Sequence, residues 1–516
     1  MTVLAPGARA FLSLLAALVT APVLAYATPA TPAAPAAGCQ YLELAKLPVR
    51  YTGPALSLTI EGQIDGTPAD MLVDTGAAAS MLTRTATERR GLKLSRSDER
   101  MVGIGGHARM YTARIREFRA GPALLRNERV RVAGDMGFTP SFDAILSAGF
   151  LLQTDFEISL ATREIRFFKP TNCKKAMLAY WAKDGDAVEI PFATTFSRHP
   201  NPYFKVQLNG KDAVAMIDSG AATTVVTRKA AERAGLALDA PGVERAADAV
   251  GLGLRSVPRW NATIGTLQIG RETIEHAEVG VLDTDEMEVD VLLGADFLRA
   301  HRVLFAMSQK KLYISYVGGE PLGQRRSIEP WIQQEAEAGN GDAQLLVGFM
   351  HAHGHGVPRD QQQARAWIEK AAAGGHPRGQ LLLGQRLVDE GRHAEAAGHL
   401  RQALERMPAE RHGALWLYAA RMHGGDAQEA RRELAARFAR DDANDWPRPV
   451  ADFYLGTLSE EKLLALARED GAGARQRTCQ ARVYIAQGYR LAGEPARAQQ
   501  VLDGATECRP PPAGSP

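Results

Sequence analysis

Two short stretches of the chain could each present a carboxylate at the end of a buried strand. Met71–Ala77 reads Met-Leu-Val-Asp-Thr-Gly-Ala, and Ala215–Ala221 reads Ala-Met-Ile-Asp-Ser-Gly-Ala. Two facing carboxylates a few ångströms apart cannot both ionise easily, so such a pair shares a proton. Asp74 and Asp218 could then act together on a bound water, one as general acid and the other as general base.

The residues that follow each aspartate suit this chemistry. The hydroxyl groups of Thr75 and Ser219 could hydrogen-bond inside the loop and fix the orientation of the carboxylate. Gly76 and Gly220 allow the backbone to turn sharply and to place N–H groups near the carboxylates. We therefore expect these four residues to support an aspartate dyad.

The similarity around the two aspartates extends over a longer segment. The aspartates lie 144 positions apart (218 − 74), and further positions match at the same offset. The matches are Gly66 with Gly210, Thr83-Arg84 with Thr227-Arg228, Glu88-Arg89 with Glu232-Arg233, and Gly91-Leu92 with Gly235-Leu236. A duplicated unit is the economical interpretation. Short alternating apolar segments around the aspartates predict strands with one buried face.

The doubled motif resembles that of the retropepsin-like aspartic proteases, and the resemblance covers residues 50–317. A glycine-bearing hairpin stands in each half where the family has its substrate-covering flap. Its residues are Gly103, Ile104, Gly105 and Gly106 in the first half and Gly251, Leu252 and Gly253 in the second. Late apolar stretches, 144–151 and 291–298, stand where the family has a segment that lies beside the catalytic loop and begins a helix. The resemblance implies a covalent pseudo-dimer in which each half contributes one aspartate to a shared cleft.

The first late stretch departs from the family pattern Leu-Gly-x-Asp-Phe-Leu, which the second copy fits. Ser147 stands where glycine is expected, and Gly149 stands where aspartate is expected. Serine is small enough to fit, so we expect the departure to affect the local stability of the first half more than the role of Asp74.

A chain of 516 residues is too long for a single core. The predicted class is a mainly-β pseudo-dimeric acid-protease fold followed by an all-α tetratricopeptide-like solenoid. The predicted parts are a signal peptide (1–27), a disordered linker (28–45), lobe 1 (46–172), an inter-lobe linker (173–187), lobe 2 (188–318) and helical repeats (328–510).

The N-terminal residues have the pattern of a secretory signal. Arg9 precedes an apolar run from Ala10 to Val23, and Ala25-Tyr26-Ala27 is a small-x-small cleavage site. The run is too short to span a bilayer comfortably, although a retained anchor is the alternative. No later run is long enough to cross a membrane, so we expect an exported bacterial protein, periplasmic or secreted.

The four cysteines are Cys39, Cys173, Cys479 and Cys508. An even number of cysteines in an exported chain favours disulfides, and the sequence allows three connectivities. We favour the local pairs, in which Cys39 with Cys173 brackets lobe 1 and Cys479 with Cys508 locks one helical hairpin.

Beyond Gly323 the composition becomes helical and rich in Ala, Leu and Arg. Residues 341–376 resemble one SEL-type tetratricopeptide-like repeat, and Gly379–Gly384 begins the next, 36 residues on (384 − 348). Such arrays stack helix pairs into a solenoid whose concave face binds peptide or protein. The repeats could recruit a substrate or an envelope partner, or they could only shield or space the first part of the chain.

The charge balance excludes a dedicated nucleic-acid binder. The chain has 61 basic and 59 acidic residues and a net charge of +2, without a basic excess. His351, His353 and His355 alternate in a loop of the first repeat, but no acidic or cysteine companion converges on them in sequence. We therefore predict no metal site and no cofactor.

Three functions remain to be compared. The first is an exported aspartic endopeptidase that hydrolyses a polypeptide with a water activated by Asp74 and Asp218. The second is a catalytically inactive peptide-binding or scaffold protein of the cell envelope, which the departure at Ser147 and Gly149 motivates and the two intact aspartates oppose. The third is a phosphate-binding enzyme of the sugar-kinase type, for which the sequence lacks a Gly-rich phosphate loop.

Overall fold

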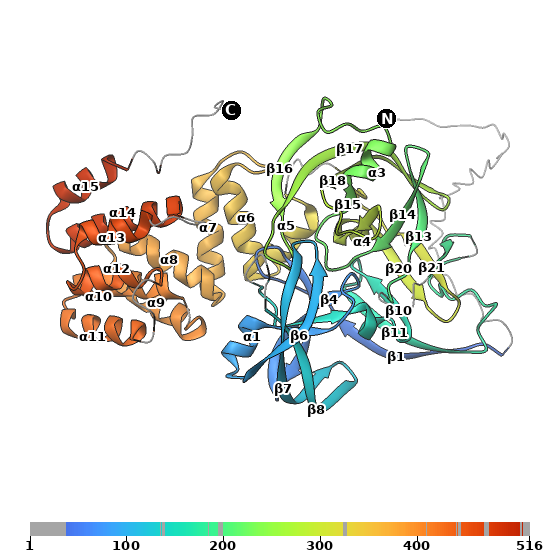
Figure 1. Ribbon diagram of the computed structural model, residues 1–516, viewed down its shortest axis with the longest axis horizontal. Coiled ribbons are helices and arrows are strands. Elements are labelled where there is room, and N and C mark those ends of the chain that lie inside the picture. Colours follow the sequence, from blue (N-terminus) through green and yellow to red (C-terminus); the bar gives the residue numbers. More distant parts are fainter. Residues whose placement is uncertain are drawn as a thin grey trace, which may run out of the picture.

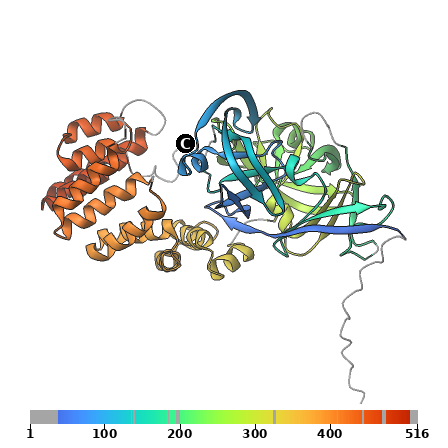
Figure 2. The same ribbon diagram turned by 90° about the horizontal axis from the view of Figure 1, so that it is seen from below.

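The computed structural model describes residues 38–134, 136, 140–183, 185–193, 200–323, 328–408, 410–439, 441, 445–468, 474–505 and 508. A β-rich part and a helical part lie side by side, as both views show (Figures 1 and 2). The predicted signal peptide and residues 28–37 of the predicted linker lie outside the described residues. None of the helices in the described ranges is long and apolar enough to cross a membrane.

Lobe 1 is built on an eight-stranded sheet with the order β2-β3-β4-β9-β5-β8-β7-β6. Its strands are β2 (Arg50–Thr52), β3 (Ser57–Ile64), β4 (Thr67–Asp74), β5 (Met81–Thr83), β6 (Leu94–Gly103), β7 (Gly106–Ala120), β8 (Ala123–Ala133) and β9 (Ala144–Ser147). Two short helices accompany them, α1 (Arg84–Arg89) and α2 (Ala148–Leu151).

Lobe 2 repeats this arrangement with seven strands in the order β13-β14-β19-β15-β18-β17-β16. Its elements are β13 (Phe204–Leu208), β14 (Lys211–Ile217), β15 (Val225–Thr227), α3 (Arg228–Arg233), β16 (Glu244–Ala249), β17 (Val257–Ile269), β18 (Glu272–Leu282), β19 (Val291–Leu293) and α4 (Ala295–Ala300). From β3 and from β13 the two orders match strand for strand, and the pairs β4–β9 and β14–β19 are both parallel. The sequence repeat is therefore a repeat of structure.

The matched sequence positions have matched local roles. Thr83 and Thr227 are the N-caps of α1 and α3, and each hydroxyl accepts a backbone N–H of the first turn. Gly66 and Gly210 lie in the hairpin turns before β4 and β14 with φ of +80° and +74°, a conformation that favours glycine. The matched arginines each bind the aspartate that precedes the late strand, in the pairs Arg89–Asp143 and Arg233–Asp290.

A third sheet joins the two lobes in the order β1-β11-β10-β20-β21-β12. Its strands are β1 (Gln40–Pro48), β10 (Asp155–Ser159), β11 (Glu164–Thr171), β12 (Val188–Pro191), β20 (His301–Ala306) and β21 (Lys311–Tyr316). Strand β10 of lobe 1 pairs antiparallel with β20 of lobe 2, and Phe156 lies opposite Phe305. Both rings are fully buried, so this sheet gives the two lobes a common core.

The predicted disordered linker is wrong over residues 40–45, because these residues belong to strand β1. The strand pairs with β11 from Gln40 opposite Thr171 to Pro48 opposite Glu164. Two tertiary contacts explain why this segment is ordered: Tyr41 stacks on Phe168 with ring centroids 4.7 Å apart, and the disulfide bond of Cys39 fixes its start.

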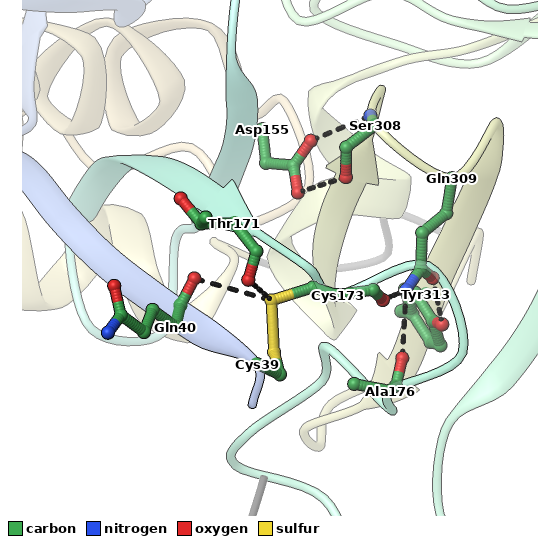
Figure 3. The surroundings of a disulfide bond; sticks show 9 residues. All are labelled: Cys39, Gln40, Asp155, Thr171, Cys173, Ala176, Ser308, Gln309 and Tyr313. Carbon is green, nitrogen blue, oxygen red and sulfur yellow. Dashed lines mark hydrogen bonds between the residues drawn. A yellow bond between two sulfur atoms is a disulfide. The ribbon is translucent and has the colours of Figure 1, made fainter. Parts of the chain in front are cut away.

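Both disulfides pair as predicted, Cys39 with Cys173 and Cys479 with Cys508. Figure 3 shows the first bridge beside the start of β1, where Gln309 of lobe 2 donates to the carbonyl groups of Cys173 and Ala176 at 2.6 and 2.8 Å. This bridge therefore anchors the edge of lobe 1 next to the β20–β21 hairpin of lobe 2.

The helical part consists of α5 (Pro330–Glu337), α6 (Gly341–His353), α7 (Gln361–Ala373), α8 (Pro377–Asp389), α9 (His393–Arg406), α10 (Arg411–His423), α11 (Ala427–Phe438), α12 (Arg448–Leu455), α13 (Glu460–Arg468), α14 (Ala474–Leu491) and α15 (Pro495–Asp503). The N-cap side chains Asn340 and Asp360 start α6 and α7 by accepting backbone N–H groups. Successive helices stack into a solenoid, as Figures 1 and 2 show.

The first helices pack directly on the β-rich part. Ile332, Val347 and Trp367 belong to the same buried apolar cluster as the cores of the two lobes. A hydrogen bond of 2.7 Å from the Gly53 N–H to the Asp342 carboxylate adds a polar contact at this boundary. The start of the solenoid is thus part of one continuous core with the lobes.

Candidate active site

The two aspartates lie at the same place in the two lobes. Asp74 ends β4, and Asp218 directly follows β14, each beside a parallel strand of the late stretch. The chain reverses sharply after each of them, because Ala77 N–H donates to the Asp74 carboxylate at 2.8 Å and Gly220 N–H donates to the Asp218 carboxylate at 2.9 Å. Both carboxylates are therefore oriented by their own loops.

The structure brings the predicted pair together. A Cβ atom on Gly76 would lie 2.4 Å from Cγ of Asp218, and a Cβ atom on Gly220 would lie 2.5 Å from Cγ of Asp74. Each carboxylate thus packs on the backbone of the glycine in the opposite loop. Glycine is required at both positions because any side chain would displace the opposite aspartate.

Thr75 and Ser219 lock the two loops by a reciprocal exchange of hydrogen bonds. The Thr75 hydroxyl donates to the Ile217 carbonyl at 2.7 Å and accepts the Ser219 N–H at 3.1 Å. The Ser219 hydroxyl donates to the Val73 carbonyl at 2.7 Å and accepts the Thr75 N–H at 3.1 Å. Both side chains are buried. The hydroxyl groups therefore bind across the lobes, whereas the sequence predicted bonds within each loop.

The carboxyl groups of Asp74 and Asp218 both have raised pKa values. Burial and the charge of Asp218 raise the pKa of Asp74 well above its usual range, against the lowering effect of the Ala77 and Gly76 N–H groups. Burial also raises the pKa of Asp218, and N–H groups of Gly220, Ala221 and Gly76 oppose this effect.

The two predicted flap segments meet each other, and Leu252 of the second segment packs against the same apolar cluster as Ala77 of the first aspartate loop. The first is the tip of the β6–β7 hairpin, and the second is the loop between β16 and β17. Gly105 pairs with Gly253: the Gly105 N–H donates to the Leu252 carbonyl at 2.9 Å, and the Arg255 N–H donates to the Gly105 carbonyl at 3.1 Å. Figure 1 shows β6 of lobe 1 and β16 of lobe 2 converging on the same region.

The apolar tip of each flap packs against the opposite lobe. Ile104 of lobe 1 joins a lobe 2 cluster that contains Val225 and Leu282. Leu252 of lobe 2 joins a lobe 1 cluster that contains Met110 and Phe142. The two segments are therefore crossed, and the tip of each lies against the opposite lobe.

The two late stretches reach the same hydrogen-bond pattern by different residues. In lobe 2 the Thr224 hydroxyl accepts the Gly294 N–H at 3.0 Å and donates to the Asp296 carboxylate at 2.8 Å. In lobe 1 the Ser80 hydroxyl accepts the Ser147 N–H at 3.0 Å and lies 3.1 Å from the Ser147 hydroxyl. The Ser147 hydroxyl thus takes the place of the Asp296 carboxylate, which explains why lobe 1 does without an aspartate at position 149.

One residue at the centre of the site was not predicted. Asn201, in the segment before β13, is only 1% exposed, and its side-chain amide donates to the carbonyl groups of Thr75 and Ile217. The sequence signal here is Asn-Pro, which indicates a turn and nothing about a partner 126 positions away (201 − 75). No pattern in the sequence could have identified this contact.

The described residues hold no group of three or more His, Cys, Asp or Glu side chains that could bind a metal ion. His353 and His355 instead form a ring contact with each other and with Phe349, with centroid distances from 4.1 to 5.8 Å.

Comparison with known proteins follows the division seen in the structure. Residues 60–149 match the aspartyl protease family model, residues 204–300 match the model for the aspartyl protease of gag polyproteins, and residues 341–376 match the Sel1 repeat. No curated protein matches the chain. Among solved structures, the aspartic proteinase from Irpex lacteus is similar, with 14% identity, a TM-score of 0.36, and coverage of 53% of this chain and 97% of that chain.

The family matches confirm the resemblance stated from the sequence. One aspartyl protease match contains Asp74 and the other contains Asp218, and the Sel1 match covers α6 and α7. The chain carries two aspartyl protease domains in tandem followed by a Sel1 repeat, and it is an aspartic-type peptidase.

Proposed function

We propose that the chain is an exported aspartic endopeptidase in which Asp74 and Asp218 form one catalytic dyad. The observation that carries this proposal is the mutual packing of each carboxylate on the glycine of the opposite loop, with Thr75 and Ser219 exchanging hydrogen bonds beneath. Two lobes held in this way offer two carboxylates to a single substrate. A peptide-holding scaffold would have no chemical need for such a pair.

We assign different roles to the two carboxyl groups. Burial and the nearby charge of Asp218 raise the pKa of Asp74. Two carboxyl groups this close cannot both ionise easily, so they share one proton, and we assign that proton to Asp74. Asp218 is the ionised partner and accepts backbone N–H groups that stabilise its charge. A protonated acid and an ionised base thus stand side by side at the same pH.

Peptide hydrolysis follows from this arrangement without a covalent enzyme intermediate. Asp218 takes a proton from a water as the water oxygen bonds to the scissile carbonyl carbon, and Asp74 gives its proton to the carbonyl oxygen. The resulting tetrahedral diol collapses when Asp218 passes the proton to the leaving nitrogen and Asp74 regains one from a diol hydroxyl. The C–N bond breaks, and the dyad returns to its starting protonation state.

The flaps supply the cover that this chemistry needs. A polypeptide in extended form would pair its backbone with the flap segments Gly103–Gly106 and Gly251–Gly253 while water is excluded around it. Because the flap tips contact each other and the opposite lobes, they have to part for the substrate to enter.

The repeats suggest how the peptidase binds other proteins, and the cysteines suggest the compartment in which it acts. Sel1-type arrays are protein-interaction scaffolds, so the solenoid is the surface on which a substrate protein or an envelope partner would dock. Two disulfides are compatible with an oxidising compartment, the periplasm or the exterior. Together with the signal-like residues 1–27, they support export.

The test is cleavage of a peptide library by the purified mature protein over about pH 4 to 8. Asp74→Asn and Asp218→Asn should each lower kcat/KM by about 10²- to 10⁴-fold, and a pepstatin-type inhibitor should block the wild type. Asp212→Asn, an exposed aspartate of the same lobe as Asp218, is the control and should keep full activity. Loss in only one dyad variant, or no cleavage by folded wild type, would contradict the proposal.

A further inference from the structure

Asn201 connects the two dyad loops from outside both of them. It lies between β12 and β13 in lobe 2, and its side-chain amide nitrogen donates to the Thr75 carbonyl of lobe 1 and, at 2.9 Å, to the Ile217 carbonyl of lobe 2. A primary amide has two N–H donors, so both bonds can form at once. One side chain thus bridges the two aspartyl protease domains next to both aspartates.

The two carbonyl groups that Asn201 holds belong to peptide units that matter for the dyad. A peptide unit is planar, so fixing the Thr75 carbonyl also fixes the direction of the Gly76 N–H on the same plane. Gly76 packs against the opposite carboxylate, since a Cβ atom on it would lie 2.4 Å from Cγ of Asp218, and its N–H lowers the pKa of both carboxyl groups. The Ile217 carbonyl and the Asp218 N–H belong to one peptide unit, so fixing the carbonyl also fixes this N–H. The Asp218 N–H donates to the Leu293 carbonyl at 2.9 Å.

This contact breaks the symmetry of the two lobes. The position that corresponds to Asn201 at the repeat offset is Ser57 (201 − 144), in strand β3. Within the described residues no side chain donates to the carbonyl of Ser219, the counterpart of Thr75. Only one of the two equivalent loop peptides is therefore held by a side chain, and it is the one whose glycine N–H serves both carboxylates.

Asn201 is poorly suited to a role in packing alone. It is buried, and its Oδ1 atom has no hydrogen-bond partner among the described residues. A buried acceptor without a partner is unfavourable, and an apolar side chain of the same size would avoid this cost. The residue type makes sense for the two bonds that its nitrogen donates.

We propose that Asn201 is a positioning residue of the dyad, which clamps the Thr75–Gly76 and Ile217–Asp218 peptides together and so directs the Gly76 N–H at the two carboxylates. This inference rests on the proposed catalytic role of Asp74 and Asp218. The two hydrogen bonds of the Asn201 amide go to backbone carbonyl groups and not to the carboxylates, so Asn201 acts through the backbone.

The test compares Asn201→Ala with Asn209→Ala. Asn209 is a matched control because its side-chain amide also bridges backbone groups of lobe 2. It donates to the Ala234 carbonyl and accepts the Thr266 N–H, at 2.9 Å each. Asn201→Ala should lower kcat by about 10- to 100-fold with KM little changed, because the reacting groups are misaligned. Both limbs of its pH–rate profile should move to higher pH, since the Gly76 N–H, which lowers both carboxyl pKa values, is no longer held toward the carboxyl groups. Asn209→Ala should lose stability only.

Asn201→Asp provides a second, sharper comparison. Its carboxyl group keeps the size of asparagine and, when protonated, can donate one of the two hydrogen bonds. Activity should therefore be partly recovered at acid pH and fall below that of Asn201→Ala once the carboxylate ionises opposite two carbonyl oxygens. A pH profile of Asn201→Ala and Asn201→Asp that keeps the wild-type position, with losses no larger than the unfolded fraction, would overturn the proposal.

A measurement without substrate separates this inference from the proposed function. If wild type cleaves nothing, the proposed function fails, but the pH dependence of the thermal midpoint still reports on the dyad. Asn201→Ala should change that pH dependence in the wild-type background and leave it unchanged when Asp74 and Asp218 are both asparagine. The same change in both backgrounds would show that Asn201 acts elsewhere, and the inference would be wrong.

Discussion

Gly105 of lobe 1 and Gly253 of lobe 2 pair backbone to backbone, so that the flaps of the two domains are hydrogen-bonded to each other. Gly253 has a φ of +106°, and a Cβ atom on it would lie 2.3 Å from the carbonyl carbon of Gly105. The contact between the two segments therefore depends on the absence of a side chain at Gly253.

Gly253→Ala should open this contact, because both the backbone conformation and the space forbid a Cβ atom. We expect a higher KM for peptide substrates and an unchanged thermal midpoint, since the flap tips lie outside the main core. Gly251→Ala is the matched control: its Cβ atom would meet only a methyl group of Ile104, which can rotate away. Equal effects of the two substitutions on KM would contradict this reading of the flap contact.

The dyad should make the protein less stable as the pH rises. Both folded-state pKa values lie above the ordinary aspartate value of 3.8. Between 3.8 and the raised values the folded state binds more protons than the unfolded state, so the free energy of unfolding falls with increasing pH. Below 3.8 both states are protonated, and the stabilising effect of the raised pKa values is fully present.

The variant with both Asp74→Asn and Asp218→Asn should lose this pH dependence, because amides do not titrate. Thermal midpoints measured at closely spaced pH values should show wild type falling relative to the double variant from acid to neutral pH. Parallel curves for the two proteins would mean that the pKa values of the two carboxyl groups are not raised in the folded state. Asp212→Asn is the control for a general loss of charge and should follow the wild type.

Ser219→Ala should destabilise the contact between the domains. It removes the donor to Val73 and the acceptor of the Thr75 N–H in a buried site, and we expect a cost of about 1–3 kcal/mol in the free energy of unfolding. Ser219→Thr retains the hydroxyl, as Thr75 does in lobe 1, and should remain active. Denaturant unfolding measures both variants, and a Ser219→Ala protein as stable as wild type would refute the importance of the exchange.

The two late stretches should respond differently to truncation. Asp296 accepts the Thr224 hydroxyl and the N–H groups of Thr224 and Phe297, whereas Ser147 offers a single hydroxyl to Ser80. Hydrogen bonds to a charged acceptor contribute about 1.5–3 kcal/mol each, roughly twice the neutral kind. Asp296→Ala should therefore lower the thermal midpoint more than Ser147→Ala. The reverse order would show that lobe 1 depends on its unusual serine.

Asp342 should matter for the attachment of the solenoid to lobe 1. Burial favours its neutral form, but the hydrogen bonds from His376 and the Gly53 N–H outweigh this effect, and the pKa of Asp342 is lowered. Its stabilising effect is thus present above the ordinary pKa of 3.8 and is lost as the pH falls through the lower folded value.

Asp342→Ala should consequently lower stability at neutral pH and have little effect in strong acid. Limited proteolysis should cut more readily between lobe 2 and α6 in this variant. Asp360→Ala is the control, since Asp360 caps α7 within the solenoid by accepting the N–H groups of Gln362 and Gln363. Protection equal to that of wild type in Asp342→Ala would show that the apolar cluster alone holds the solenoid.

The sequence by itself determined the duplication, the positions of the two aspartates and the glycine-bearing segment in each half. It also indicated where the helical repeats begin and favoured the cysteine pairs that the structure shows. These features depend on local patterns: alternation along a strand, glycine in a turn, and a hydroxyl at a helix N-terminus. Repetition at a fixed offset made each local pattern more informative, because two copies of Asp-Thr/Ser-Gly in matched surroundings are far less common than one.

Only the tertiary structure decided how the copies meet. The packing of Asp74 on Gly220, the crossed hydroxyl groups of Thr75 and Ser219, and the clamp by Asn201 join residues that are more than a hundred positions apart in the chain. Strand β1 was missed for the same reason, since its order comes from β11 and from the Cys39–Cys173 bridge. Contacts of this kind depend on the relative placement of whole sheets, which no pattern within a few neighbouring residues encodes.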